Sequence, residues 1–183
     1  MNINYQLFFL CYGAVQHSPA FRAIALFVAN YGDVVVSLAA VLFLLWLLIW
    51  KQNARSLKRG TWDKELFAVA VSVGTAWFVT FILKILFHAA RPFVVFPLVH
   101  PLISETPYTS FPSGHATVFF ALAVVMTYYH KRAGWLFLAA ALVVSLSRVF
   151  AGVHFPGDIL AGAVVGTSVA VMVHAWIKGK FKN

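Results

Sequence analysis

Three ionisable side chains lie close together between two long apolar runs, in the stretch from Ser147 to Asp158. Ionisable groups are costly at membrane depth, so such a cluster indicates a functional site. Asp158 follows His154 by four residues, about one helical turn, so its carboxylate can face the imidazole. Pro156 suits the first position of the next helix. A turn before it would bring Arg148 back toward the imidazole. The alternative interpretation is a buried ion pair that only fixes helix register.

Two further cations lie near the end of an earlier apolar run. Lys84 interrupts residues 78–87, and Arg91 follows it by seven residues. Seven residues are two helical turns, so both side chains are predicted to share one helix face, about 10 Å apart along the axis. Pro92 is consistent with the chain leaving the helix near Arg91. Such a pair favours an anion with several oxygens, although Lys84 could instead snorkel and Arg91 anchor the interface.

The sequence Pro112-Ser113-Gly114-His115 precedes the next apolar run. Ser113 can cap the helix that begins there, and Gly114 allows the backbone to approach a ligand closely. Free N–H groups at a helix N-terminus form an anion site, with His115 beside it in the first turn. The alternative is a capped helix that carries a solvated histidine.

Other polar side chains receive simpler interpretations. We expect loop or solvent-exposed positions for His88, His100, Glu105 and Tyr108, and no chemistry for His130 and His174. Two histidines and an aspartate could hold a metal ion, but three nearby cations would oppose a metal and suit a phosphate. We therefore expect neither a metal nor another cofactor.

The composition is that of an integral membrane protein, which must position these groups with helices. The 183 residues are 62% hydrophobic and 10% charged, with a mean hydropathy of +0.85. This length suits one domain, residues 1–183, with about six transmembrane helices in an all-α bundle. The single cysteine, Cys11, excludes an internal disulfide, and no cleavable signal precedes the apolar residues.

The net charge of +9 is explained by loops and not by nucleic-acid binding. Of 14 basic residues, ten fall in residues 51–64, 131–132 and 178–182, at the ends of apolar runs. This distribution predicts that these segments are cytoplasmic. No nucleic-acid partner is expected, and the oligomeric state stays open.

The apolar runs predict five transmembrane helices at residues 34–50, 66–87, 114–129, 135–151 and 156–177. Residues 1–32 form either an interfacial helix followed by a short transmembrane helix or one irregular transmembrane segment. Ser18 and Pro19 suit a helix start, and residues 30–33 suit a turn. Alternation of these helices places all the candidate residues together at their outer ends.

The three segments together resemble the type 2 phosphatidic acid phosphatase superfamily. Its pattern is K-x6-R-P, then P-S-G-H, then S-R-x5-H-x3-D, and residues 84–158 match it at every position. The resemblance implies a core like that of acid phosphatases and vanadium-dependent haloperoxidases. Residues 91–94 and 110–113 look most like bacterial undecaprenyl-diphosphate phosphatases, although some of those carry Asp where this chain has Gly114.

The resemblance also implies roles for individual residues. His154 is the nucleophile that forms a phosphohistidine, Asp158 orients it, and His115 is the general acid. The residues expected to bind the phosphate are Lys84, Arg91, Ser113, Gly114 and Arg148. The implied substrate is a lipid phosphate held in the bilayer, and the implied location is the inner membrane, with the site facing outside.

Several rival functions share these motifs. Within the same chemistry, the alternatives are a phosphatidylglycerophosphate or phosphatidate phosphatase and a lipid phosphotransferase. The hydropathy argues against a haloperoxidase, which is soluble. A membrane scaffold or transporter is the non-enzymatic alternative, but a transporter should carry ionisable groups near mid-bilayer between repeated halves.

Overall fold

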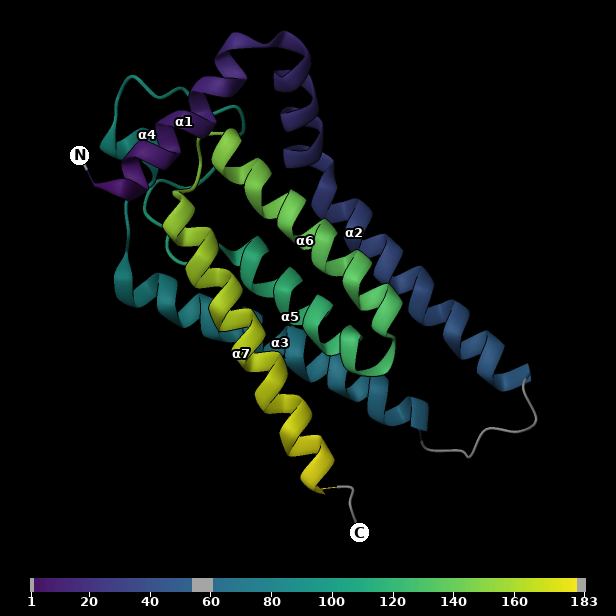
Figure 1. The fold of residues 1–183 in the computed structure, drawn as a ribbon. Helices are drawn as coiled ribbons and strands as arrows, with labels where there is room; N and C mark the ends of the chain where they lie inside the picture. Colours follow the sequence, from purple (N-terminus) through teal and green to yellow (C-terminus); the bar gives the residue numbers. More distant parts are fainter. Residues whose placement is uncertain (1, 54–60, 181–183) are drawn as a thin grey trace.

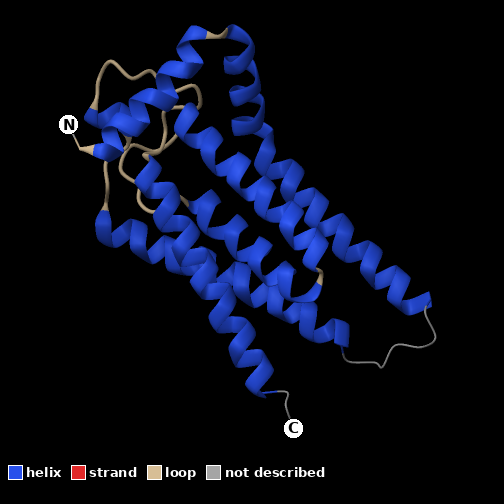
Figure 2. Cartoon of the chain, in the orientation of Figure 1, coloured by secondary structure: helices blue, strands red, loops and turns tan. Residues whose placement is uncertain are grey.

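The computed structural model describes residues 2–53 and 61–180, and all regular elements in this part are helices (Figure 2). In chain order these are α1 (Ile3–His17), α2 (Pro19–Asn53), α3 (Thr61–Phe87), α4 (Pro92–Val95), α5 (Gly114–Tyr129), α6 (Lys131–Phe150) and α7 (Pro156–Lys180). The all-α prediction is confirmed. Residues 54–60 of the predicted basic loop and 181–183 of the basic tail lie outside the described residues.

The N-terminal region contains two separate helices, and the second is much longer than predicted. The Phe21 N–H donates to Ser18 Oγ at 3.3 Å, so α2 begins as expected. The helix then continues through residues 30–33, where the turn was predicted, and this prediction is wrong. Gly32 lies within the helix and packs closely on α6, where a Cβ would lie 3.0 Å from Val144 Cγ2.

Four of the described helices are long and apolar enough to cross a membrane, within Pro19–Ile49, Lys64–Val95, Lys131–Phe150 and Pro156–Lys180. The apolar helix Gly114–Tyr129 is shorter. The number of transmembrane helices is close to, but not exactly, the predicted value of about six, because residues 19–32 are part of α2 and do not form a separate short transmembrane helix. The chain is a multi-pass membrane protein with helices at all five other predicted positions.

The shorter helix α5 is the centre of the bundle, with α3, α6 and α7 packed around it, and α2 packs on α6 (Figure 1). Glycines allow α7 to approach α5 closely. A Cβ at Gly162 would lie 2.7 Å from the Ser113 carbonyl oxygen, and one at Gly166 would lie 2.1 Å from that of Thr117. Small residues one turn apart are a common way for membrane helices to pack. This contact sets the distance between two elements of the candidate site.

One end of the bundle is covered by α1, α4 and the segment between α4 and α5 (Figure 1). Tyr5 and Phe9 of α1 pack edge-on against Phe96, with ring centroids 5.2 and 4.9 Å apart. Asn4 Oδ1 accepts a hydrogen bond of 2.8 Å from the Gly157 N–H at the start of α7. We call α1, α4 and the segment between α4 and α5 the cover. Within it, α1 joins the end of α4 to the start of α7, the helix that carries Asp158.

Candidate active site

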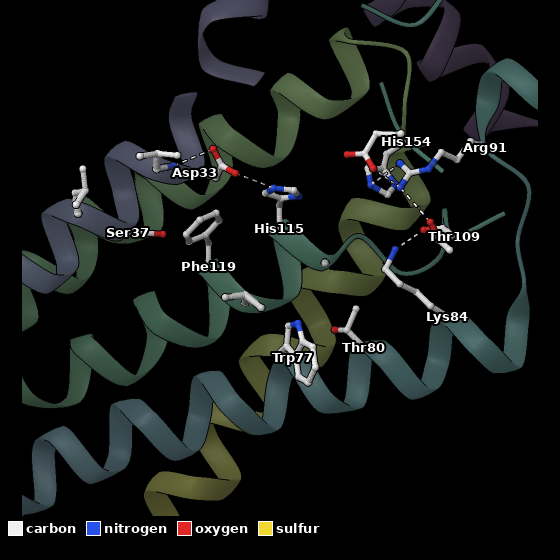
Figure 3. Close-up of a pocket in the computed structure, with 15 residues that line it drawn as sticks. Asp33, Ser37, Trp77, Thr80, Lys84, Arg91, Thr109, His115, Phe119 and His154 are labelled. Carbon is white, nitrogen blue, oxygen red and sulfur yellow. Dashed lines mark hydrogen bonds and ion pairs between the residues drawn. The ribbon is translucent and has the colours of Figure 1, made fainter. Parts of the chain in front are cut away.

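A pocket of about 640 Å³ opens beneath this cover, between α2, α3 and α5 (Figure 3). Five of the predicted site residues line it: Lys84, Arg91, Gly114, His115 and His154. The other three, Ser113, Arg148 and Asp158, are buried and at most 6% exposed. Residues up to 70 positions apart in the chain thus meet around one cavity.

The turn between α6 and α7 brings His154 back toward the pocket. The Val153 N–H donates to the Arg148 carbonyl at 3.1 Å and the Gly152 N–H to that of Val149 at 3.0 Å, which is the Schellman pattern of a helix end. Gly152 has φ of 77°, a left-handed conformation that glycine adopts without steric cost. The next helix begins at Pro156, as predicted.

Asp158 is held in place by three hydrogen bonds to its Oδ2 atom. They come from Ser110 Oγ at 2.6 Å, from the Phe155 N–H at 2.9 Å, and from His154 Nδ1 at 3.3 Å. The bond from Phe155 satisfies a free N–H at the start of α7, as the acidic residue of a capping box does. Because Asp158 accepts from Nδ1–H, the other ring nitrogen of His154 keeps its lone pair.

His154 is 2% exposed, and its Nε2 atom lies 3.2 Å from Arg91 Nη1. The pKa of His154 is lowered to about 4, mainly by burial and also by the nearby Arg91 and Lys84, although the hydrogen bond to Asp158 opposes this change. The imidazole is therefore neutral near pH 7, which is the state that a nucleophile requires.

Arg91 does not share a helix face with Lys84, so that part of the prediction is wrong. Helix α3 ends at Phe87, and His88 adopts a left-handed conformation with φ of 41°. Arg91 then precedes α4, and its Nη1 donates to the Val153 carbonyl at 2.8 Å. Lys84 donates to the Thr109 carbonyl (Figure 3). Both cations reach the pocket because the chain turns after α3.

Arg148 lies beside His115, and the guanidinium that contacts the His154 imidazole belongs to Arg91. Arg148 Nη2 contacts His115 Nε2. The sequence predicted instead that the turn after α6 brings Arg148 toward His154, whose imidazole contacts Arg91. The cause is the direction of the side chain, which extends from the last turn of α6 toward α5. Arg148 Nε is buried without a hydrogen-bond partner in the described part of the chain.

Ser113 and Gly114 begin α5, but the serine does not cap it through its side chain. Ser113 occupies the N-cap position with no side-chain cap bond, and its buried Oγ has no partner among the described residues. A Cβ at Gly114 would lie 3.8 Å from both Lys84 Cε and Thr80 Cγ2, an ordinary contact. The protein itself therefore leaves room for a side chain at Gly114.

Two acidic residues of the pocket were missed from the sequence. Asp33, assigned to a turn, lies on α2 with its Oδ2 atom 3.4 Å from His115 Nε2 (Figure 3). Glu105, assigned to the loop surface, lies 3.0 Å from Arg91 Nη2 and 3.8 Å from Arg148 Nη1. The available signal for Asp33 was the rarity of acids within apolar runs.

The pocket also has an apolar part that extends away from the charged groups along α2, α3 and α5. It is lined by Val34, Leu38, Trp77, Val118 and Phe119. Trp77 and Phe119 lie on the side of the pocket away from Arg91 in Figure 3. The site can thus hold a charged group and an apolar chain together. Within residues 2–53 and 61–180, no three His, Cys, Asp or Glu side chains gather as metal ligands.

Comparisons with known proteins show the family and the fold. The family model described as the PAP2 superfamily matches residues 65–182. The chain is 31% identical to the putative undecaprenyl-diphosphatase YbjG of Escherichia coli (strain K12), covering 90% of this chain and 78% of that protein. It is 27% identical to the undecaprenyl-diphosphatase BcrC of Bacillus subtilis (strain 168), covering 93% and 82%. The crystal structure of Aquifex aeolicus LpxE has the same fold, with a TM-score of 0.75, 23% identity and 96% of each chain covered.

Proposed function

Because the chain belongs to the PAP2 superfamily of membrane phosphatases, we propose that it removes the terminal phosphate of undecaprenyl diphosphate. The products are undecaprenyl phosphate and inorganic phosphate. The observation that carries the proposal is one pocket with cations and two imidazoles at one end and apolar side chains at the other. The relatives named undecaprenyl-diphosphatases support this choice among lipid phosphates.

In the proposed reaction, His154 Nε2 attacks the terminal phosphorus. An N–P bond forms, the bond from phosphorus to the bridging oxygen breaks, and His115 gives a proton to that departing oxygen. Water then attacks the phosphohistidine, His115 takes a proton from the water, and phosphate leaves. Asp158 keeps the Nδ1 proton in place throughout, as the acid of a triad does.

The cations neutralise the phosphoryl oxygens during both steps. Lys84, Arg91 and Arg148 are the three proposed to do so, and the free hydroxyl of Ser113 and the N–H of Gly114 add hydrogen bonds. Phosphoryl transfer depends mainly on positioning and on charge stabilisation, which fixed cations supply. We therefore expect turnover in the presence of EDTA.

A panel of lipid phosphates tests the substrate. Detergent-solubilised protein with EDTA is assayed for phosphate release from undecaprenyl diphosphate, phosphatidylglycerophosphate and phosphatidate at matched detergent ratios, with His154→Asn as the inactive control. Undecaprenyl diphosphate should give the highest kcat/KM. A preference for either of the others would overturn the substrate, and no release from any of the three would overturn the enzyme class. Phosphate moved to a lipid acceptor would identify a phosphotransferase.

The site is proposed to face the outside of the inner membrane, where it recycles the carrier lipid for cell-wall synthesis and gives some bacitracin resistance. The basic residues Lys131 and Arg132 at the start of α6, and Lys178 and Lys180 at the end of α7, lie at the opposite end of the bundle and support this orientation. In a Cys11→Ser background, Tyr108→Cys on the cover should react with an impermeant maleimide in spheroplasts, whereas Lys180→Cys should react only after lysis. The reverse pattern would overturn the orientation.

A further inference from the structure

A carboxylate on α2 faces His115, the proposed general acid. Asp33 lies within the membrane-spanning stretch Pro19–Ile49, 14 residues from its start. Its Oδ2 atom is 3.4 Å from His115 Nε2 and 3.9 Å from Arg148 Nη2, and its side chain is 33% exposed. An acid in an apolar helix is costly and indicates a function.

The other described acidic side chains contact groups other than His115, although Glu105 shares Arg148 with Asp33. Asp158 is bonded to His154, and Glu105 is paired with Arg91 and Arg148. Glu65 contacts His130 at the junction of α5 and α6. Among these side chains, Asp33 is the carboxylate that contacts the imidazole of the proposed general acid.

We propose that Asp33 is a positioning residue that holds His115 as the proton donor. The inference rests on the proposed function. His115 faces the Arg148 guanidinium and the His154 ring, and Lys84 and Arg91 line the same pocket. Burial and these positive charges oppose a positive charge on His115, and the negative charge of Asp33 offsets part of this effect.

The contact also sets which edge of the ring takes part. Asp33 approaches Nε2 of the His115 ring (Figure 3). It is proposed to keep this edge of the ring in the pocket, where the bridging oxygen of the substrate would lie. The Nε2 proton passes to the departing oxygen as the P–O bond breaks, and Asp33 remains a carboxylate. When water attacks, Nε2 takes a proton again and its positive charge lies beside Asp33. Asp33 thus contacts the reacting nitrogen of His115, whereas Asp158 contacts the nitrogen of His154 that does not react.

A double-mutant cycle tests this pairing on the lipid phosphate that the wild type hydrolyses best. Asp33→Asn should lower kcat about 10- to 100-fold, part of the roughly 10²- to 10⁴-fold that a general acid contributes and that His115→Ala removes. Because Asp33 acts through His115, the double variant should lie within about twofold of His115→Ala. Multiplicative losses would overturn the inference, as would an Asp33→Asn enzyme within twofold of wild type.

The pH profile separates positioning from a structural effect. In Asp33→Asn the alkaline limb of the pH profile of kcat should move to lower pH by about one unit or more. The reason is that the negative charge of Asp33 no longer favours the protonated form of His115. Asp33→Glu should restore the limb and part of kcat. An unmoved limb in Asp33→Asn would overturn the inference. Asn30→Ala, one turn earlier on α2 and outside the pocket lining, is the matched control and should behave as wild type.

The two hypotheses fail in different ways. If wild type releases no phosphate, or if His115→Ala keeps near-normal activity, the proposed function fails first. If His115→Ala is impaired and Asp33→Asn is not, only the role of Asp33 fails. Thermal unfolding of each variant in detergent checks the fold, and Asp33→Ser, which also removes the charge, replaces Asp33→Asn as the test if the latter does not fold.

Discussion

The packing of α7 on α5 should control catalysis, and Gly166→Ala tests this most directly. The added Cβ would lie 2.1 Å from the Thr117 carbonyl oxygen and 3.0 Å from the Ala121 nitrogen. Ordinary contact begins near 3.4 Å, so the two helices must separate by roughly 1.3 Å at this point. Both neighbours are backbone atoms, so no side-chain rotation can relieve the overlap.

This separation reaches the site because each helix carries part of it. Thr117 follows His115 by two residues on α5, and Gly166 follows Asp158 by about two turns on α7. A misplacement of about 1 Å between reacting groups can reduce the rate about 10²-fold. Forced overpacking also costs about 1–3 kcal/mol of stability. We therefore expect kcat/KM to fall about 100-fold and the unfolding temperature to drop.

The assay is phosphate release well below the unfolding temperature, together with thermal unfolding in detergent. Gly74→Ala on α3 is the matched control, because a Cβ there meets nothing within 4 Å, and it should be neutral or slightly stabilising. Gly162→Ala, with its nearest contact at 2.7 Å, should be intermediate. Near-normal activity and stability of Gly166→Ala, or an equal loss in Gly74→Ala, would refute this reasoning.

Three other predictions concern the immediate surroundings of the phosphate. Ser110→Ala removes the 2.6 Å hydrogen bond to Asp158 and should lower kcat about tenfold with KM little changed, since bonds to charged groups contribute about 1.5–3 kcal/mol. Glu105→Gln removes the anion paired with Arg91, so inorganic phosphate should inhibit about fivefold more strongly in steady-state assays, about 1 kcal/mol. The pKa of His154 is about 4, so its ring ¹⁵N shifts in labelled protein should stay those of a neutral imidazole as the pH falls to about 5, and change as it falls through 4.

Each of these three predictions would be contradicted by a specific result. Ser104→Ala, at an exposed serine of the same cover, should match wild type, and an equal loss there would remove the role of Ser110. Weaker phosphate inhibition in Glu105→Gln would mean that the acid supports Arg91 instead of competing with phosphate. A His154 signal, assigned with His154→Asn, that titrates near the ordinary 6.5 would contradict the effect of burial.

The local features of this chain could be predicted from the order of its residues. Apolar runs predicted the helices from residue 34 onward, because each must hide its backbone polar groups within the membrane. The pair His154 and Asp158 is four residues apart, so one turn is enough to join them. The starts of α2 at Pro19 and α7 at Pro156 follow from proline, which has a fixed φ and no N–H to leave unpaired.

Contacts between distant segments could not be predicted in this way, because they depend on how each helix is rotated about its axis. Residues 30–33 have the composition of a turn, yet they are helical, with Gly32 packed closely against α6 and Asp33 in the pocket. Which arginine meets which histidine also depends on the tertiary structure. Arg91 reaches His154 from across 63 residues, whereas Arg148, six residues from His154, extends to His115 on α5.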